Sequence, residues 1–363
     1  MTTNALPVLS RTLAQHEPAP VRLAVRVSDH LDAAEWDSYA SGHHDATIDH
    51  LSGWRTIFTR VFGQRAEYLV ARRGPEVVGI LPLVLFRSML FGRFGVSVPY
   101  LNYGGMLTSD GDAADALVAR AVELTRAFGG SHLELRHQAR RLPDAVWRQH
   151  KVRMVLPLPT TEDDLWKALD RKVRNQVRKA QKEGLTIHAG GAELLPDFYD
   201  VFARNMRDLG TPVHSLRFFQ AVTREFAQAE VVVIRHLGIT VAASITLRFR
   251  DTVIVPWASS LREARPLCPN MLLYWAMLGR AIESGARAFD FGRSTRGAGT
   301  HQFKLQWGAT EVPLHWEYVL LSRPDAPDQG TSNATYGRLV TLWQRIPVPV
   351  TRLIGPPIAA NIP

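Results

Sequence analysis

The sequence contains very little cysteine: Cys268 is the single one among 363 residues. One thiol can form neither an internal disulfide nor a thiolate zinc cluster, so both kinds of stabilisation are excluded. The scarcity of thiols suits a reducing compartment. The 13 histidines form no HExxH motif and no other paired ligand spacing, and we therefore expect no metal ion.

Long hydrophobic runs are also missing. The most apolar stretch, residues 77–101, is interrupted by two prolines and two arginines, whereas a membrane-spanning helix needs about 20 mostly apolar residues. Residues 1–20 have no apolar core of signal-peptide length, and we expect them to form a flexible N-terminus. These absences predict a soluble, cytoplasmic protein.

Acidic residues are fewer than basic ones: 34 Asp and Glu stand against 43 Lys and Arg, a formal net charge of +9. This excess favours an anionic partner such as nucleic acid, a phosphorylated substrate or an acidic membrane surface, solubility alone being the alternative. The hydrophobic fraction of 46% indicates a globular chain. At roughly 150 residues per domain, the length predicts about two domains.

The chain contains one arrangement of elements twice. Residues 66–83 and 229–247 both read as a strand, a glycine turn and a strand. In both places a helical pattern precedes the hairpin, and a helix and an apolar strand follow it. Chance similarity is the alternative, but the repeated order favours a tandem duplication. We expect one α+β domain over 21–157 and a second over 160–322.

A strongly basic segment opens the second unit. Residues 165–184 hold seven Lys and Arg but only two Asp and Glu. Apolar residues recur at every fourth position from Leu165 to Val177, which predicts one helix that ends at Gly184. The basic residues occupy its other faces. They are either a solvated surface or a phosphate-binding one, since arginine can bind phosphate with two parallel hydrogen bonds.

Three runs resemble the FemAB family. Residues 172–180 with Gly184 resemble its K-x-R-N-x-x-R-K-A…G segment, and residues 288–292 and 299–308 resemble its ending. That family carries two GNAT-like folds in tandem, which agrees with the duplication. The resemblance covers about residues 22–322. It implies an α+β fold of two tandem GNAT-like (acyl-CoA N-acyltransferase-like) domains with mixed twisted sheets.

Residues 208–215 and the proline-rich ending resemble the FemAB-like proteins associated with PEP-CTERM/exosortase exopolysaccharide systems. Family members of the peptidoglycan type transfer an amino acid from aminoacyl-tRNA to an amine on a nucleotide-linked wall precursor. The resemblance implies an amide-forming transferase of cell-envelope or exopolysaccharide biosynthesis, with aminoacyl-tRNA or acyl-CoA as donor and no bound cofactor. Residues 184–195 leave no room for the long helical hairpin of some peptidoglycan members, which keeps the acyl-CoA alternative open.

Acyl transfer to an amine needs a proton acceptor, oxyanion stabilisation and a held donor. By resemblance, Lys304 faces the reacting centre, where an ammonium would stabilise the developing charge. Asp290 lies between two phenylalanines in an apolar strand and points to the opposite face. It is a candidate proton acceptor, and an ion pair with Arg293 or Arg296 is the alternative.

Further candidates bind substrate. Asn270 is the expected N-cap of a helix that begins at Met271, where a GNAT-type unit binds donor phosphates. The loop before it lacks the glycine-rich phosphate loop of coenzyme A users. By resemblance, Tyr103 lies where the family binds the acceptor. The full set of expected substrate-binding residues is Lys172, Arg174, Asn175, Arg178, Lys179, Tyr103, Asn270, Arg293 and Ser294.

The last segment, residues 323–363, reads as a proline-rich tail with one short amphipathic helix near 336–346. Tryptophan and leucine beside arginine suit the interface of a membrane. The tail therefore either contacts the inner membrane peripherally or packs on its own domain. A different class of function also stays open: a non-catalytic RNA- or polymer-binding protein that uses the basic helix.

Overall fold

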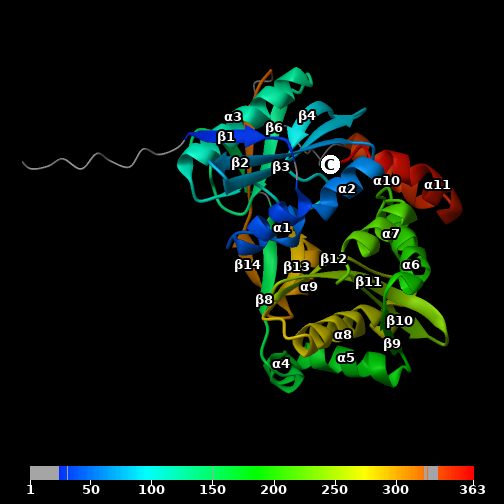
Figure 1. Ribbon diagram of the computed structural model, residues 1–363. Helices are drawn as coiled ribbons and strands as arrows, with labels where there is room; N and C mark the ends of the chain where they lie inside the picture. The colour runs from blue at the N-terminus through cyan, green and yellow to red at the C-terminus, as the bar shows by residue number, and fades with distance from the viewer. Residues whose placement is uncertain (1–23, 31, 150, 323–324, 326–333) are drawn as a thin grey trace, which may run out of the picture.

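The computed structural model describes residues 24–30, 32–149, 151–322, 325 and 334–363, arranged as two mixed β-sheets with helices around each (Figure 1). The N-terminus expected to be flexible, residues 1–20, lies outside the described residues. In the described part of the chain, no helix is long and apolar enough to cross a membrane.

The first sheet has the order β1-β2-β3-β4-β6-β15-β7, with β5 paired to β3. β4 and β6 run parallel, and the other neighbours run antiparallel. Its strands are β1 (Val25–Ser28), β2 (Arg65–Arg73), β3 (Glu76–Ser88), β4 (Gly92–Val96), β5 (Leu107–Thr108), β6 (His132–His137), β7 (Val146–Arg148) and β15 (His315–Leu320).

The second sheet has the order β14-β8-β13-β12-β11-β10-β9. Again one neighbouring pair, β12 and β13, is parallel, and the others are antiparallel. Its strands are β8 (Val152–Pro157), β9 (Thr186–Gly190), β10 (Glu230–His236), β11 (Ile239–Phe249), β12 (Thr252–Ser260), β13 (Ala288–Ser294) and β14 (Thr310–Pro313).

The two sheets repeat one topology, as the duplication in the sequence predicts. The predicted hairpins are present as β2–β3 and β10–β11. Gly74 and Gly238 stand at their turns with φ of 64° and 80°, a left-handed conformation that favours glycine. Glu134 and Asp290 occupy matching places, because each lies on the second strand of the parallel pair in its sheet.

The sheets do not divide at one point of the chain. β8 follows the first unit but pairs with β13 and β14 in the second sheet, while β15 crosses back to pair with β6 and β7. The expected domain ranges 21–157 and 160–322 therefore do not coincide with sheet membership. An unpaired sheet edge offers free backbone hydrogen-bonding groups to any strand that lies beside it. Here each sheet is extended by a strand from the other unit's part of the chain.

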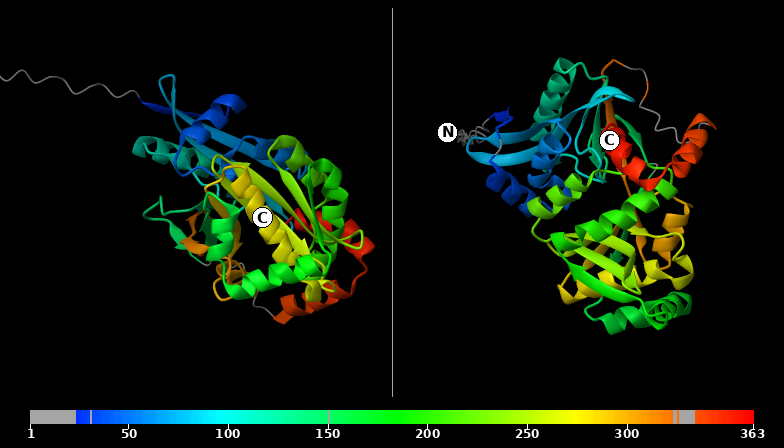
Figure 2. Two further views of the ribbon diagram at one scale, coloured as in Figure 1. Left: turned by 90° about the horizontal axis from the view of Figure 1, so that it is seen from below. Right: turned by 90° about the vertical axis from the view of Figure 1, so that its right-hand side faces the viewer.

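Helices cover both sheets. α3 packs on one face of the first sheet, while α1 and α2 pack on the other. In the second unit α6 and α7 lie above the sheet and α8 below it, with α5 on the outer side of α8 (Figures 1 and 2). These helices are α1 (Ala33–Gly42), α2 (Gly53–Arg60), α3 (Gly111–Ala127), α5 (Arg171–Lys182), α6 (Leu195–Asp208), α7 (Leu216–Glu225) and α8 (Pro269–Glu283).

The basic segment is not the single helix expected over 165–184. It forms α4 (Glu162–Ala168) and α5, separated by Leu169 and Asp170, whose ψ is 145° at both residues. The apolar stripe is nevertheless buried, Leu169 included, at 5% exposure. Because the residue at the break continues the stripe, periodicity alone gave no sign of it.

The C-terminal tail also differs from the expectation of one short helix. It forms α10 (Ala334–Arg345) and then α11 (Val348–Ala359), which contains Pro356 and Pro357. Both prolines lie in the last turns of α11, and because they have no N–H, the carbonyl oxygens of Arg352 and Leu353 lack their usual helical donor. The stripe Thr351, Gly355 and Ala359 is buried, and α11 packs on α6.

The end of the tail is tied to the first unit as well. The Tyr100 hydroxyl donates to the carbonyl oxygen of Ala360 at 2.9 Å, and Ser88 Oγ donates to that of Asn361 at 2.7 Å. The described part of the tail therefore packs on its own chain and bridges both units.

Candidate functional site

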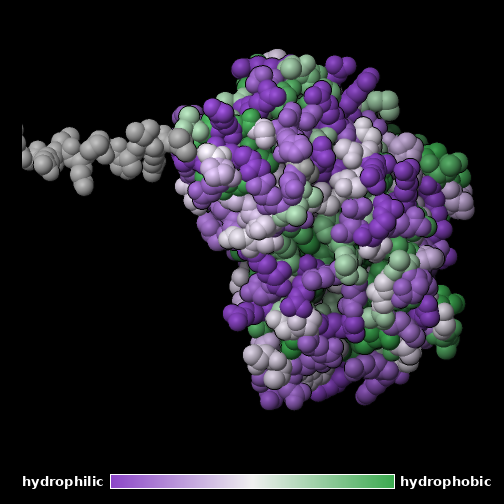
Figure 3. All heavy atoms as spheres, viewed as in Figure 1, coloured by the Kyte–Doolittle hydropathy of each residue, from purple (hydrophilic) through white to green (hydrophobic). Residues whose placement is uncertain are grey.

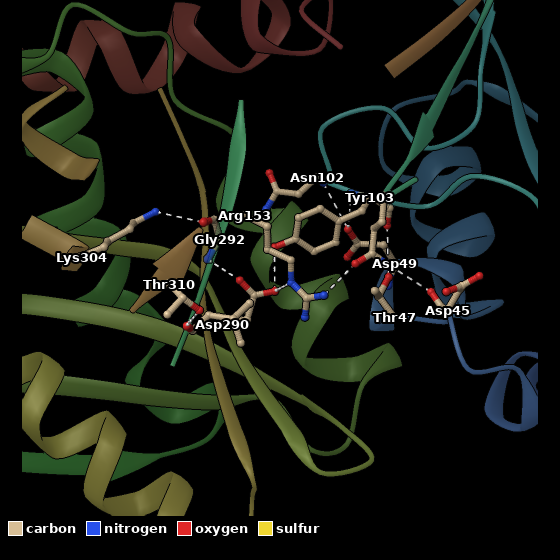
Figure 4. Close-up of polar contacts among 12 residues, drawn as sticks. Asp45, Thr47, Asp49, Asn102, Tyr103, Arg153, Asp290, Gly292, Lys304 and Thr310 are labelled. Atoms are coloured by element: carbon tan, nitrogen blue, oxygen red, sulfur yellow. Dashed lines mark hydrogen bonds and ion pairs between the residues drawn. The ribbon is translucent and has the colours of Figure 1, made fainter. Parts of the chain in front are cut away.

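A buried polar network joins the two units (Figure 4). Asp290 on β13 is 1% exposed. Its Oδ2 accepts hydrogen bonds from the Tyr103 hydroxyl and from Arg153 Nε, each at 2.7 Å, and its Oδ1 accepts one from the Gly292 backbone N–H at 2.7 Å. Asp290 is thus held by three donors, two of which come from other strands or loops.

The expected partners of Asp290, Arg293 and Arg296, do not pair with it. Arg296 pairs with Glu311, with Nε and Oε2 2.7 Å apart. Arg293 instead lies over the Trp316 ring, and a β-bulge shifts the register of β13 between Asp290 and Arg293. Gly292 lies in this bulge with φ of 73°.

Tyr103 is the first unit's contribution to the network. It is fully buried, and its backbone N–H donates to Asp49 Oδ2 at 3.0 Å. Burial, and then the charge of Asp290, raise the pKa of Tyr103 well above its ordinary value, so the phenol stays a neutral donor. The structure therefore brings together Tyr103 and Asp290, two predicted site residues from different units of the chain.

Sequence reasoning missed Arg153. It lies on β8, donates from Nη1 to Gln138 Oε1 at 2.7 Å, and stacks on the Tyr103 ring with its guanidinium carbon 5.0 Å from the centroid. One signal was available: Arg153 interrupts an apolar strand, as Asp290 does.

Asp49 was also missed, and the sequence carries no signal for it beyond a place near a predicted helix start. It is 3% exposed and accepts the backbone N–H groups of Asn102 and Tyr103. Burial raises the pKa of the Asp49 carboxyl to about 7, although these two hydrogen bonds act in the opposite direction.

Lys304 lies on α9 (Gly299–Leu305) and is 8% exposed. Its Nζ donates to the carbonyl oxygens of Gly292 at 3.2 Å and Arg293 at 2.9 Å. Burial lowers the pKa of Lys304 to about 8, with Asp290 opposing and Arg293 adding to the effect. The two candidate catalytic residues are thus adjacent through Gly292, whose N–H bonds Asp290 and whose carbonyl accepts from Lys304.

Cations gather at the end of β13. Arg293 lies over the Trp316 ring, its guanidinium carbon 5.4 Å from the centroid, and burial lowers its pKa to about 10. Lys151 Nζ donates to Thr295 Oγ1 at 2.6 Å. Among the described residues, no carboxylate forms an ion pair with Lys151, Arg293 or Lys304. The predicted residue Ser294 is here too, with a buried Oγ that lacks a hydrogen-bond partner.

The basic helix lies elsewhere. α5 packs on α8 along the lower edge of the molecule in Figure 1, away from the network of Figure 4. Within the described part of the chain, no interaction links α5 to Asp290, Tyr103 or Lys304. The structure therefore does not bring five predicted residues to the site: Lys172, Arg174, Asn175, Arg178 and Lys179.

Asn270 is not the N-cap of its helix. α8 begins two residues earlier than expected, at Pro269, and the cap position is Cys268, whose φ of 57° is left-handed. Proline at the first helical position explains the earlier start, since its fixed φ is already helical. Asn270 instead lies in the first turn of α8.

A second cationic feature lies where α2 of the first unit meets α7 of the second. A hollow of about 280 Å³ is present there, and Arg217 Nη2 donates to the Arg60 carbonyl oxygen at 3.1 Å. Figure 3 shows hydrophilic side chains gathered over these helices. The lining residues are Arg60, Val61, Arg217, Gln220, Ala221 and Arg224.

One group within the described residues has ligand atoms close enough for a metal ion: His43, His44 and Asp45, within 4.8 Å of one another. The Asp45 carboxylate is already paired with Arg141, and Arg250 donates to the His43 carbonyl oxygen at 2.7 Å. Two cations beside the group disfavour a third. The expectation that the protein binds no metal stays a prediction.

Two α+β units in tandem, each with one parallel strand pair and sharing a buried polar network, define a tandem GNAT-like architecture. Residues 167–305 match the family described as "Acetyltransferase (GNAT) domain". This match covers most of the second unit and agrees with a GNAT-like fold there. No curated protein matches the sequence.

Solved structures share the fold. A structure titled "Crystal structure of FemX" has a TM-score of 0.64 at 16% identity, covering 82% of this chain and 98% of its own. L-PGS from Bacillus licheniformis has 0.55 at 14% identity, covering 89% and 97%. A tandem GNAT protein from the clavulanic acid biosynthesis pathway has 0.51 at 12%, covering 83% and 100%. The fold implied by the FemAB resemblance is thus confirmed.

Proposed function

We propose that the protein is an acyltransferase or aminoacyltransferase that forms an amide on an amine acceptor in cell-envelope or exopolysaccharide biosynthesis. The observation that carries this proposal is the buried network at the junction of the two units, where Lys304 and Asp290 flank the Gly292 peptide. Buried ionisable groups with shifted pKa values concentrate at catalytic sites.

The reaction joins the amine nitrogen to the donor's carbonyl carbon and breaks the ester C–O or thioester C–S bond. The amine loses a proton, and the leaving group gains one. Lys304, with a pKa of about 8, is suited to these proton movements near the strand end. Its ammonium stabilises negative charge on the carbonyl oxygen or the leaving group and can pass its proton to the leaving group, and the resulting neutral amine can take the proton that the substrate amine loses.

Asp290 suits positioning better than proton abstraction. Both of its oxygens already accept hydrogen bonds, from Tyr103, Arg153 and Gly292. Removing it would free the Tyr103 ring and the bulge that presents Lys304. We therefore propose Asp290 as the residue that fixes the geometry of Tyr103 and Gly292, in place of the proton acceptor that the sequence favours.

An anionic substrate fits the charge distribution. Lys151, Arg293 and Lys304 lie together at the end of β13, and Arg60 and Arg217 line the hollow between α2 and α7. Phosphates of aminoacyl-tRNA, coenzyme A or a nucleotide-linked acceptor would complement these cations. The tandem GNAT fold neighbour, whose name mentions AcCoA, supports acyl-CoA as a donor, whereas aminoacyl-tRNA rests on the FemAB resemblance of the sequence.

The competing proposal is a non-catalytic RNA- or polymer-binding protein that uses the exposed basic residues of α5. Mass spectrometry separates the two: the full chain is incubated with aminoacyl-tRNA or acyl-CoA and a panel of amines. A new amide that depends on the protein supports the transferase. Salt-sensitive RNA binding with no product from any donor would favour the binding protein.

A further inference from the structure

The outer face of α11 is apolar. Its five exposed positions are all apolar, and Leu353 is 78% exposed. Arg352 is the one charged residue of this helix, and it pairs with Asp200 rather than facing solvent alone. A helix at a water-facing surface normally turns polar residues outward. The exposed residues are Pro349, Val350, Leu353, Ile354 and Pro357.

The turn between β3 and β4 is equally apolar. Met89, Leu90 and Phe91 are 88%, 63% and 46% exposed. The turn is ordered, because Ser88 Oγ accepts the backbone N–H groups of Leu90 and Phe91 at 3.0 and 3.1 Å. Three consecutive exposed apolar residues at a hairpin tip are therefore presented by the fold rather than left there by disorder.

Hydrogen bonds join the turn to the end of α11. The Met89 backbone N–H donates to Asn361 Oδ1 at 2.8 Å, and Ser88 Oγ donates to the Asn361 carbonyl oxygen. Ile362, 40% exposed, is the next residue. The right-hand view of Figure 2 shows the turn and α11 on the same side of the molecule, and Figure 3 shows hydrophobic side chains at the edge where α11 lies.

The two segments that form this apolar surface carry charges of one sign. Neither residues 84–109 nor residues 334–363 contain an acidic residue. Arg87, Arg93 and Arg345 are exposed beside the turn and the helices. A second copy docking through the same surface would bring these arginines against one another, because a two-fold interface pairs each patch with itself. An anionic lipid surface complements them.

We propose that the outer face of α11 and the β3–β4 turn form one docking surface for a membrane that contains anionic phospholipid. The aliphatic side chains enter the boundary between headgroups and acyl chains, and the arginines contact the phosphates. The surface includes the turn of the first unit, which lies outside the tail, residues 323–363, that the sequence offers as a membrane contact. It is independent of the proposed catalysis, since lipid binding needs no donor or acceptor.

Vesicle co-sedimentation of the full chain tests the proposal. Vesicles of phosphatidylcholine with phosphatidylglycerol should bind the protein, and phosphatidylcholine alone should bind it more weakly. Leu353→Ser with Ile354→Ser, and separately Leu90→Ser with Phe91→Ser, should each weaken binding about tenfold or more. Arg87→Gln with Arg345→Gln should remove most of the preference for phosphatidylglycerol. All of these side chains are at least 36% exposed, so thermal unfolding should be unchanged.

The matched control is Leu237→Ser with Ile239→Ser, which removes two apolar side chains, 87% and 66% exposed, from the β10–β11 turn. Binding should persist in this control. An equal loss in the control, or no sedimentation with either vesicle, would overturn the proposal. The proposal would also be overturned if light scattering shows a dimer that becomes a monomer in the Leu353→Ser, Ile354→Ser variant, because the occupant of the surface would then be a second copy.

Discussion

At the scale of single residues, the network at the junction holds two carboxyls in different states. Asp290 is held by Arg153 and two further donors, whereas Asp49 meets only backbone N–H groups. Burial without a cation disfavours the charged form of Asp49, while the guanidinium beside Asp290 compensates its charge. The two carboxyls therefore predict different responses to pH and to substitution.

Asp49 should make the protein less stable as pH rises. Its pKa is about 7 in the folded protein against an ordinary value of 3.8, so between these pH values the folded chain holds more protons than the unfolded chain. The stabilisation is complete below about pH 4 and is lost as pH rises through about 7, amounting to about 4 kcal/mol. In urea unfolding, Asp49→Asn should show a flatter profile from pH 4 to 8. Parallel profiles for the two proteins would contradict the shifted pKa.

Removing Asp290 should cost more stability than removing the Tyr103 hydroxyl. Asp290→Ala leaves the mostly buried Arg153 guanidinium without its counter-charge, at about 3–5 kcal/mol. Tyr103→Phe removes one hydrogen bond to a charged group, at about 1.5–3 kcal/mol. A double-mutant cycle measured by urea unfolding should give a loss for the pair smaller than the sum. Strict additivity would show that the two side chains do not interact.

At the scale of elements, two cationic surfaces compete for the phosphate of a substrate. α5 lies at the lower edge, and the hollow between α2 and α7 lies at the junction (Figure 1). A small ligand cannot touch both, whereas a folded RNA can. The effect of substitutions on each surface therefore reports the size of the donor.

We predict that Arg217→Ala with Arg224→Ala weakens binding of coenzyme A or a nucleotide sugar about tenfold at low salt, and that added salt reduces this difference. Arg174→Ala with Arg178→Ala should weaken binding of tRNA and lower its salt dependence, but should leave coenzyme A unaffected. Calorimetric titrations with each ligand measure this. Coenzyme A binding that depends on α5 alone would place the donor on the basic helix.

The elements that the sequence predicted well are those set by local pattern. The two hairpins and the buried stripe of the basic segment follow from alternation, turn glycines and four-residue spacing. The break at Leu169 escaped prediction because that residue is buried in either conformation. α11 escaped it because its prolines read as a helix stop, whereas the helix packs on α6 and brings Gly355 close to Val213, both tertiary contacts.

At the scale of the whole molecule, contacts between distant residues decide the site, and a single sequence does not encode their pairing in any local pattern. Asp290 and Lys304 stood out from the strand pattern and the family resemblance. The contact of Asp290 with Tyr103 spans 187 positions, and that with Arg153 spans 137. The contact with Arg153 depends on the exchange of β8 into the second sheet, which no periodicity indicates.

The strand exchange predicts that the units do not fold independently. A fragment of residues 1–157 would lack β15, leaving the edge of β6 unpaired, and would carry β8 without its partners β13 and β14. It should aggregate or stay unfolded, as an exposed sheet edge promotes. The full chain should unfold in one calorimetric transition. A soluble, cooperatively folding 1–157 fragment would contradict this coupling.

Amide formation at the junction of the two units can be tested by measuring product formation by Lys304 variants. Mass spectrometry would follow the new amide with aminoacyl-tRNA or acyl-CoA and an amine panel. We expect the native protein to form a product. Folded Lys304→Ala should form it about 10²–10³ times more slowly, and Lys304→Arg should also be impaired. A folded Lys304→Ala protein that forms the amide at the native rate would contradict it.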